Sequence, residues 1–340
     1  QASKNCDMIK DREFTGENTM QFIVLDMEWN QAKSSRAVVR KPVFLNGEII
    51  QIGAVKLNEN FEMTDKIKIA VKPKYYKSMN KKVAALTSIT NDDIKNGISF
   101  AEASDKLRLW CGDDFLFMTW GPDDMGILFD NHILWGISYS WIPKCINVQD
   151  IFFNQIDNGN RQFSLTYAME KLGIDGLNEH DALNDAVNTY LVCKKLDMKS
   201  GIENSKADIF DNFSDIVFRE DSENVFKSKD AALRDSITIC FICPKCGEKM
   251  CGSDWASVNS SKVLGILRCK CGSLYAALLR FIKTQKGGCR VKRILYKFND
   301  DFNALYFKRI KIQTEKEEAF RRRKHGKRKK SSADANTKNV

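Results

Sequence analysis

QFIVLDMEW, residues 21–29, is a short apolar run with two acidic residues, and its length and composition predict a buried strand. Asp26 and Glu28 lie two positions apart, so both side chains leave the same face of that strand. Two carboxylates held together repel each other unless a cation neutralises them, and such oxygen ligands suit Mg²⁺ or Mn²⁺. The stretch therefore predicts a candidate metal site on a buried strand, although Asp-x-Glu alone also occurs at solvated strand ends.

Strands and helices are predicted to follow this run in an α/β order. Apolar runs and alternation predict strands over EIIQIGAVKL (48–57), DKIKIAVKP (65–73) and FLFMTW (115–120). Helical spacing and capping residues predict helices over 100–111, 123–135, 164–173 and 182–196. Strands followed by helices indicate an α/β sheet domain that closes near residue 198.

Two further acidic segments lie where a sheet of this class binds ligands. Asp123 and Asp124 come just beyond the strand 115–120, and ligands of open α/β sheets bind beyond the ends of the strands. His180 stands just before the helix 182–196, and Asp185 lies within about the first turn of that helix. A lone histidine in this position is more often structural, and only the complete set of acids and base indicates catalysis.

Taken in order, these segments resemble the DEDDh exonuclease superfamily, whose motifs run D-x-E, then a middle Asp, then H-x-A-x-x-D. The corresponding stretches here are DME (26–28), WGPDD (120–124) and HDALND (180–185). The middle motif looks closest to the ERI-1-like branch and to bacterial exonucleases with a DLEWNQ-like first motif, which reads DMEWNQ (26–31) here. The resemblance covers roughly residues 20–197 and implies an RNase H-like mixed sheet flanked by helices.

Carried over residue by residue, the resemblance implies a metal-binding set and a substrate-binding set. The metal-binding acids would be Asp26, Glu28, Asp124 and Asp185, with two Mg²⁺ or Mn²⁺ ions as cofactors and His180 as the general base. Asp123 stays open as an alternative to Asp124. Trp29 and the Leu86-Thr87 pair correspond to positions that pack on the terminal nucleoside, and ordinary hydrophobic packing is the other explanation for them.

The activity that the resemblance implies is hydrolysis of single-stranded RNA or DNA from the 3′ end, with release of 5′-mononucleotides. An imidazole takes a proton from water near neutral pH, which suits His180 to the role of base. We expect an exoribonuclease, because of the resemblance to the ERI-1-like branch, and a DNA exonuclease is the close alternative. The alternatives from other classes are a catalytically silent nucleic-acid-binding scaffold and a zinc protein that recruits partners.

Seven of the eleven cysteines crowd into residues 240–289. The odd total, the lack of an export signal and the close pairs favour metal-bound thiolates over disulfides. CPKCG (243–247) and CKCG (269–272) form two knuckles, so Cys243, Cys246, Cys269 and Cys271 are predicted to hold one structural Zn²⁺. Any of Cys240, Cys251 and Cys289 could replace one of these ligands.

The charge of the chain is concentrated in its last third. Residues 236–340 hold 25 Lys+Arg against 8 Asp+Glu, a net charge of +17, whereas residues 1–200 and 201–235 carry −3 and −4. This asymmetry favours a polyanion partner, and therefore nucleic acid. The cations Arg268, Lys270, Arg280 and Lys283 are interleaved with Tyr275 and Phe281, a pattern that suits either stacking of single-stranded bases or an ordinary solvated face.

These observations divide the chain into a leader (1–19), a DEDDh exonuclease domain (20–198), an acidic linker (199–235), a small β-rich zinc-ribbon domain (236–297) and a basic C-terminal segment and tail (298–340). RRRKHGKRKK (321–330) is expected to be disordered and to act as a phosphate anchor or a targeting signal. No run of 18 apolar residues exists, so we expect no membrane span. We expect a cytoplasmic protein, or a nuclear one if the source is eukaryotic.

Overall fold

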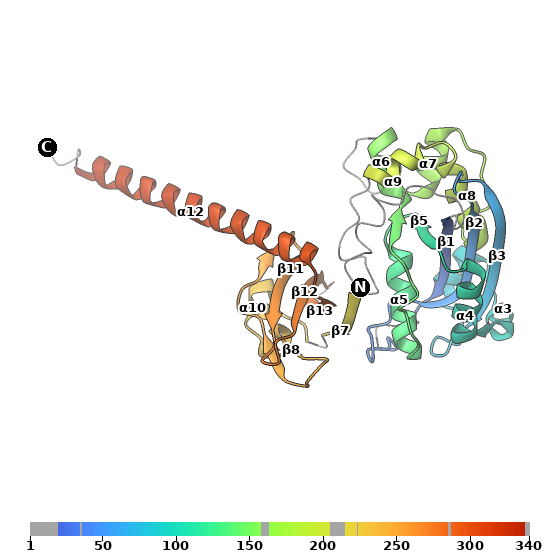
Figure 1. Ribbon diagram of the computed structural model, residues 1–340, viewed down its shortest axis with the longest axis horizontal. Helices are drawn as coiled ribbons and strands as arrows, with labels where there is room; N and C mark the ends of the chain where they lie inside the picture. Colours follow the sequence, from blue (N-terminus) through green and yellow to red (C-terminus); the bar gives the residue numbers. More distant parts are fainter. Residues whose placement is uncertain are drawn as a thin grey trace. The chain divides into compact units, whose positions relative to one another are not determined.

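The chain folds into two compact units, Gln1–Ser214 and Asp215–Val340, in a computed structural model (Figure 1). The structure describes residues 20–34, 36–157, 163–204, 215–222, 224–284 and 287–336, with side chains described through residue 319. The expected leader 1–19 lies outside the described residues.

The first unit is built on a six-stranded mixed sheet in the order β4-β3-β2-β1-β5-β6. Its strands are β1 (Gln21–Asn30), β2 (Glu48–Leu57), β3 (Met63–Lys72), β4 (Ile98–Ser99), β5 (Phe115–Thr119) and β6 (Cys145–Asn147). β1 pairs antiparallel with β2 and parallel with β5, which puts it inside the sheet. A strand covered on both faces needs a continuous apolar run, and Ile23, Val24 and Leu25 are fully buried.

Helices flank this sheet, and all four predicted helices are present. They are α2 (Lys81–Thr87), α3 (Asn91–Asn96), α4 (Phe100–Cys111), α5 (Asp123–Trp135), α6 (Val148–Ile156), α7 (Leu165–Leu172), α8 (Ala182–Cys193) and α9 (Met198–Asn204). α6, α7 and α8 pack on the face of β1 that carries Phe22 and Val24. Side chains alternate along a strand, so Asp26 and Glu28 continue that face toward α8. The RNase H-like mixed sheet flanked by helices is confirmed.

The second unit is a five-stranded antiparallel sheet in the order β10-β11-β12-β13-β7, with a separate hairpin of β8 and β9. Its strands are β7 (Ile216–Asp221), β8 (Cys240–Ile242), β9 (Lys249–Cys251), β10 (Ala256–Ser257), β11 (Lys262–Arg268), β12 (Leu274–Lys283) and β13 (Cys289–Lys297). Two short helices, α10 (Lys229–Leu233) and α11 (Ser236–Ile239), precede the hairpin.

The region that we expected to be an acidic linker, 199–235, differs from that expectation. β7 pairs with β13 at the edge of the second sheet, and α10 also lies in this region. Two of its acidic residues, Glu220 and Asp221, lie on β7, and the buried Asp221 forms an ion pair with Lys292 on β13, at 3.7 Å. Residues 205–214 and 223 of the expected linker lie outside the described residues.

The expectation of a disordered tail was wrong for the described backbone, because Asp300–Asn336 forms one helix, α12 (Figure 1). This segment has too few apolar residues to form a core, but it is rich in Lys, Arg, Glu, Gln and Ala, which are strong helix formers. The start of α12 is also anchored, since Phe302 is fully buried and its ring centroid lies 5.0 Å from that of Tyr296. The side chains of the basic run 321–330 lie outside those described.

None of the helices in the described part of the chain combines the length and the apolar composition that crossing a membrane requires.

Candidate active site

The first two acids lie on the central strand of the sheet. Asp26 and Glu28 are half-buried on β1, opposite Gly53 and Gln51 of β2. Burial raises the pKa of Asp26 well above its ordinary value, and the charges of Asp124, Asp185 and Glu28 raise it further. Burial, followed by the charge of Asp185, raises the pKa of Glu28 to about 8. Ionisation of both carboxyl groups at once is therefore unfavourable unless a positive charge lies beside them.

The middle acid comes from the first turn of α5. Asp124 is 6% exposed, and its Oδ1 accepts a hydrogen bond from the Met27 N–H of β1 at 3.1 Å. Burial raises the pKa of Asp124 to about 7, although the Met27 hydrogen bond lowers it. Asp123 is exposed. The structure thus brings Asp124, rather than Asp123, beside Asp26 and Glu28.

The third motif sits at the start of α8. Asp181 caps the helix by accepting from the Asn184 N–H, and His180 precedes it with a positive φ of 65°. The His180 N–H donates to Asp185 Oδ2 at 2.9 Å. The His180 side chain is exposed, and the backbone of this residue is in the left-handed conformation. A non-glycine residue in this conformation is strained, and such strain is common at functional sites.

The β2 and β3 strands hold the start of α8 through three residues that the sequence did not single out. Gln51 Oε1 accepts from the Ala182 N–H at 2.8 Å, and Lys68 forms an ion pair with Asp181. Gly53 lies so close to α8 that an added Cβ would be 2.1 Å from the Ala182 carbonyl carbon. A glycine inside the strand pattern IIQIGAVKL was the one signal of this close approach.

The acid cluster fits a divalent cation on two observations. Glu28, His180 and Asp185 offer ligand atoms that all lie within 4.8 Å of one another. Asp185 Oδ1 is buried and has no hydrogen-bond partner within the described residues, and a buried oxygen of this kind needs a partner. Clustered carboxylate oxygens are the ligands that Mg²⁺ and Mn²⁺ prefer.

Trp29, Leu86 and Thr87, which were expected to contact a nucleoside, differ in their exposure and in their contacts. The Trp29 indole lies against Gly47, where an added Cβ would be 2.2 Å from its Cδ1. Leu86 is 57% exposed near the end of α2. Thr87 is buried and its Oγ1 donates to the Val83 carbonyl at 3.0 Å. Leu86 is therefore available to a ligand, whereas the Thr87 hydroxyl is used within its own helix.

The four knuckle cysteines come together in the second unit. Cys243 and Cys246 lie in the turn of the β8–β9 hairpin, Cys269 and Cys271 in the turn between β11 and β12, and their sulfur atoms all lie within 4.8 Å of one another. The Sγ atoms are 3.3 Å apart for Cys246 and Cys269 and 3.8 Å apart for Cys243 and Cys271. Zinc–sulfur bonds of about 2.3 Å place tetrahedral ligands roughly 3.8 Å apart, so the cluster fits Zn²⁺.

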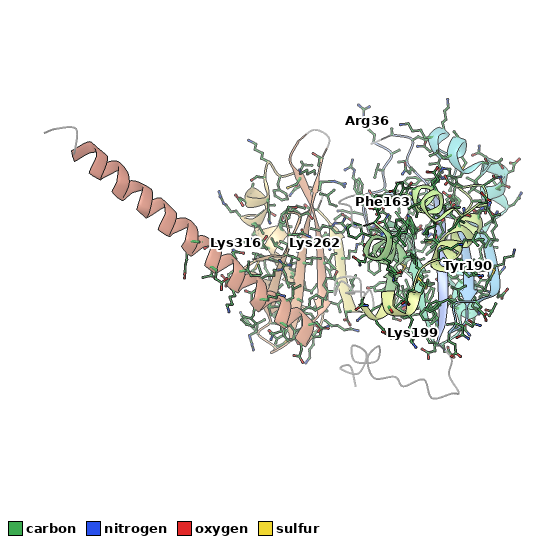
Figure 2. All side chains as sticks on the ribbon, turned by 90° about the horizontal axis from the view of Figure 1, so that it is seen from above. Arg36, Phe163, Tyr190, Lys199, Lys262 and Lys316 are labelled. Carbon is green, nitrogen blue, oxygen red and sulfur yellow. A yellow bond between two sulfur atoms is a disulfide. The ribbon has the colours of Figure 1, made fainter. Side chains whose placement is uncertain are left out.

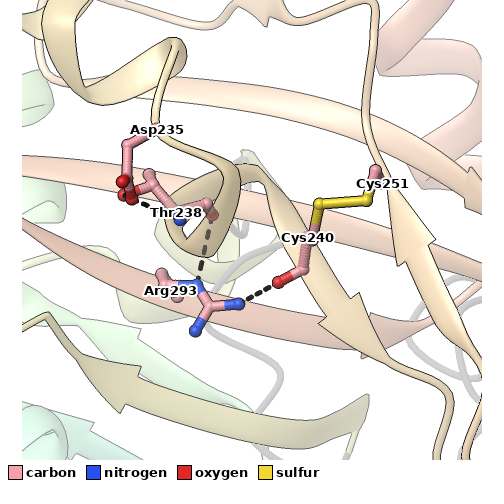
Figure 3. The surroundings of a disulfide bond; sticks show 5 residues. All are labelled: Asp235, Thr238, Cys240, Cys251 and Arg293. Atoms are coloured by element: carbon pink, nitrogen blue, oxygen red, sulfur yellow. Dashed lines mark hydrogen bonds between the residues drawn. A yellow bond between two sulfur atoms is a disulfide. The ribbon is translucent and has the colours of Figure 1, made fainter.

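The other cysteines of this unit are used elsewhere. Cys240 and Cys251 face each other across β8 and β9 and form a disulfide (Figure 3). The expectation of metal-bound thiolates over disulfides was wrong for this pair, because facing positions of one hairpin bring the two sulfur atoms together. Cys289 pairs with Lys283, at the end of β12 opposite to the knuckle. Arg293 reinforces the hairpin, since its guanidinium donates to the Thr238 and Cys240 carbonyls (Figure 3).

The aromatic residues expected to stack on bases do not reach the surface. Tyr275 and Phe281 are 9% and 8% exposed and belong to the core of the second unit. The stacking prediction for these two rings was therefore wrong, because their strand, β12, is central in the sheet and turns them inward.

Comparisons with known proteins relate the chain to nucleases. A family model described as an exonuclease, RNase T, matches residues 11–193. The nuclease domain of 3′hExo, a DEDDh family member, bound to rAMP is similar with 23% identity and a TM-score of 0.46, over 53% of this chain and 93% of that one. Cell-death related nuclease 4 (CRN-4) is similar with 19% identity and a TM-score of 0.45, over 52% and 62%. E. coli Exonuclease I in complex with a dA16 oligonucleotide is similar with 14% identity and a TM-score of 0.45, over 73% and 55%. No curated protein matches the sequence.

Proposed function

The chain belongs to the RNase T family of DEDDh-type 3′→5′ exonucleases, and from this membership we propose that it is a divalent-metal-dependent exoribonuclease that releases 5′-mononucleotides. One observation carries the proposal: Asp26, Glu28, Asp124 and Asp185 come from three distant segments to one charged cluster beside His180. A set of buried, mutually repelling acids is costly for a fold, so it indicates a role in chemistry.

The four acids would hold two divalent cations, Mg²⁺ or Mn²⁺. When bound, such cations neutralise the negative charge of the scissile phosphate and of the departing oxygen. The protein residues position that chemistry: β1 fixes Asp26 and Glu28, the Met27 N–H fixes Asp124, and the His180 N–H fixes Asp185.

His180 would act as the general base. Its exposed imidazole would take a proton from a water molecule, whose oxygen then forms a bond to the terminal phosphorus while the P–O3′ bond breaks. The departing 3′ oxygen takes up a proton and becomes the new 3′ hydroxyl of the strand. The product that leaves is the 5′-mononucleotide.

The preference for RNA over DNA is supported by the resemblance of WGPDD (120–124) to the ERI-1-like branch. The four knuckle cysteines would hold one structural Zn²⁺, which ties two turns of the second unit together. The basic run 321–330 would add phosphate contacts that do not depend on sequence.

The test compares matched 5′-labelled single-stranded RNA and DNA in Mg²⁺ or Mn²⁺. We expect a ladder that shortens from the 3′ end, faster for RNA, and an Asp26→Asn variant slower by at least about 10³-fold. The melting temperature of this variant should not fall, because Asn removes a charge that the neighbouring acids repel. Asp124→Asn should behave like Asp26→Asn, whereas Asp123→Asn is the matched control and should keep its activity. Faster cleavage of DNA than of RNA would show that DNA is the preferred substrate. Tight binding of either strand without cleavage would show a nucleic-acid-binding scaffold instead of an enzyme.

A further inference from the structure

A pocket of about 560 Å³ lies in the second unit between α12, α10 and the segment around β10. The α12 residues that line it include Arg309, Gln313 and Lys316, which are spaced by four and three residues and therefore lie on one face of the helix. Figure 2 shows Lys316 on this helix. Lys229, the first residue of α10, lines the pocket from the other side.

The walls of the pocket are fixed by packing and hydrogen bonds. The Trp255 indole lies flat against two glycines, because a Cβ added at Gly252 or Gly265 would be 2.6 or 3.0 Å from its ring atoms. The Ser257 N–H donates to Gln313 Oε1 at 3.3 Å and thereby ties α12 to β10. Packing and hydrogen bonds within the second unit therefore define the walls of this pocket.

The pocket gathers hydrogen-bond donors and positive charge. Trp255 Nε1 and Arg309 Nε are buried and have no hydrogen-bond partner in the part of the chain that the structure describes. Three cations, Lys229, Arg309 and Lys316, line the pocket, against two acids, Asp230 and Glu317. Buried donors without partners are unfavourable. The two residues that carry these donors both line the pocket.

Lys229 adds a second argument for an anion. Burial lowers the pKa of Lys229, and its Nζ lies 5.3 Å from the Phe281 ring centroid. The pocket is thus lined by a partly desolvated ammonium and by a guanidinium, which are groups that bind the oxygen atoms of a phosphate.

We propose that this pocket binds a backbone phosphate of a single-stranded nucleic acid, which makes the second unit a substrate-holding module. The inference rests on the proposed nucleic-acid substrate, since a phosphodiester strand is the polyanion that such an enzyme meets. A volume of about 560 Å³ accommodates a phosphate with its sugar. Most of the lining residues belong to the segment 236–340, whose net charge of +17 favours binding of a strand.

The experiment measures binding of a labelled single-stranded oligonucleotide by fluorescence anisotropy, with the full chain in an Asp26→Asn background to prevent cleavage. Arg309→Gln and Lys316→Gln should each weaken binding by roughly three- to tenfold. Each should also lower the slope of log affinity against log salt by about 0.7, the value for one phosphate contact of a single strand. Trp255→Phe keeps an aromatic ring at this position but removes the N–H donor, and should weaken binding with no change in that slope.

The matched controls are Lys308→Gln and Lys311→Gln, which remove the same charge from exposed positions of α12 outside the pocket. They should change affinity by less than about twofold. Equal losses in the control and pocket variants would show a diffuse charge effect and overturn the proposal, as would unchanged binding in all of them. Competition by inorganic phosphate that disappears in Arg309→Gln would support a phosphate site.

Cleavage of a dinucleotide by the otherwise wild-type pocket variants separates this inference from the proposed function. The dinucleotide is too short to need a second phosphate contact, so its rate should stay unchanged. A chain that cleaves the dinucleotide but shows no pocket-dependent binding would overturn only the pocket. A chain that cleaves neither dinucleotide nor oligonucleotide would overturn the proposed function.

Discussion

Gly53→Ala probes how the β2 strand positions α8, which carries the proposed ligand Asp185. A Cβ at Gly53 would be 2.1 Å from the Ala182 carbonyl carbon and 2.2 Å from the Leu183 nitrogen, both of them backbone atoms. Ordinary contact begins at 3.4 Å, so α8 would have to move by about 1.3 Å. This movement would carry His180 and Asp185 away from β1. A displacement of about 1 Å in a catalytic group can lower turnover by roughly 10²-fold, and overpacking destabilises a fold by about 1–3 kcal/mol.

The assay is single-turnover cleavage of labelled single-stranded RNA, together with thermal unfolding of the same preparation. We expect the single-turnover rate constant to fall by roughly 10²-fold, while the melting temperature falls by about 2–12 °C and the protein stays folded at the assay temperature. Gly126→Ala is the matched control, because an added Cβ there meets no atom within 4 Å and alanine favours the α5 helix. Wild-type turnover in Gly53→Ala would refute the idea that this contact positions His180 and Asp185.

Three further predictions concern charge and metals. In buffer free of Mg²⁺ and Mn²⁺, the raised pKa of Glu28, about 8, means that the folded state binds more protons than the unfolded one between pH of about 4.5 and 8. The melting temperature should therefore fall as pH rises through this range, and Mg²⁺ should restore it. Glu28→Gln should make the melting temperature depend less steeply on pH. A melting temperature that rises with pH would contradict this prediction. Lys68→Met should lower kcat by about two- to fivefold, because an ion pair this exposed contributes less than about 1 kcal/mol, and Lys68→Arg should recover most of the loss. Elemental analysis should find one zinc per chain, lost in Cys243→Ser and kept in Cys289→Ser, and equal loss in both variants would contradict the ligand set.

The sequence was sufficient for the elements whose signals are local. Three elements could be predicted because their signals lie within one short segment. These signals are the apolar run of β1, the pattern of apolar residues in β2 and the periodic apolar positions of α8. The motif order placed Asp26, Glu28 and His180 on the elements where they are found. The spacing of the knuckle cysteines likewise predicted a cluster that the structure brings together.

Features that depend on distant partners could not be predicted. The family motif favoured Asp124 over Asp123, but nothing near Asp124 in the sequence predicts its hydrogen bond with the Met27 N–H. The disulfide between Cys240 and Cys251 depends on the register of the β8–β9 hairpin. The α12 helix was missed because its composition resembles that of a disordered tail, while the anchoring contact of Phe302 with Tyr296 lies in the tertiary structure.

The contacts that assemble the acid cluster span long stretches of chain: Met27 meets Asp124 across 97 residues, and Gln51 meets Ala182 across 131. Loops of this length close late in folding, because their ends have much conformational freedom to lose. During synthesis, β1 and α5 emerge from the ribosome many seconds before α8 at about 5–20 residues per second. On the proposed mechanism, a nascent chain has no complete acid cluster, and therefore no nuclease activity, until residues up to Cys193 have emerged and α8 has docked.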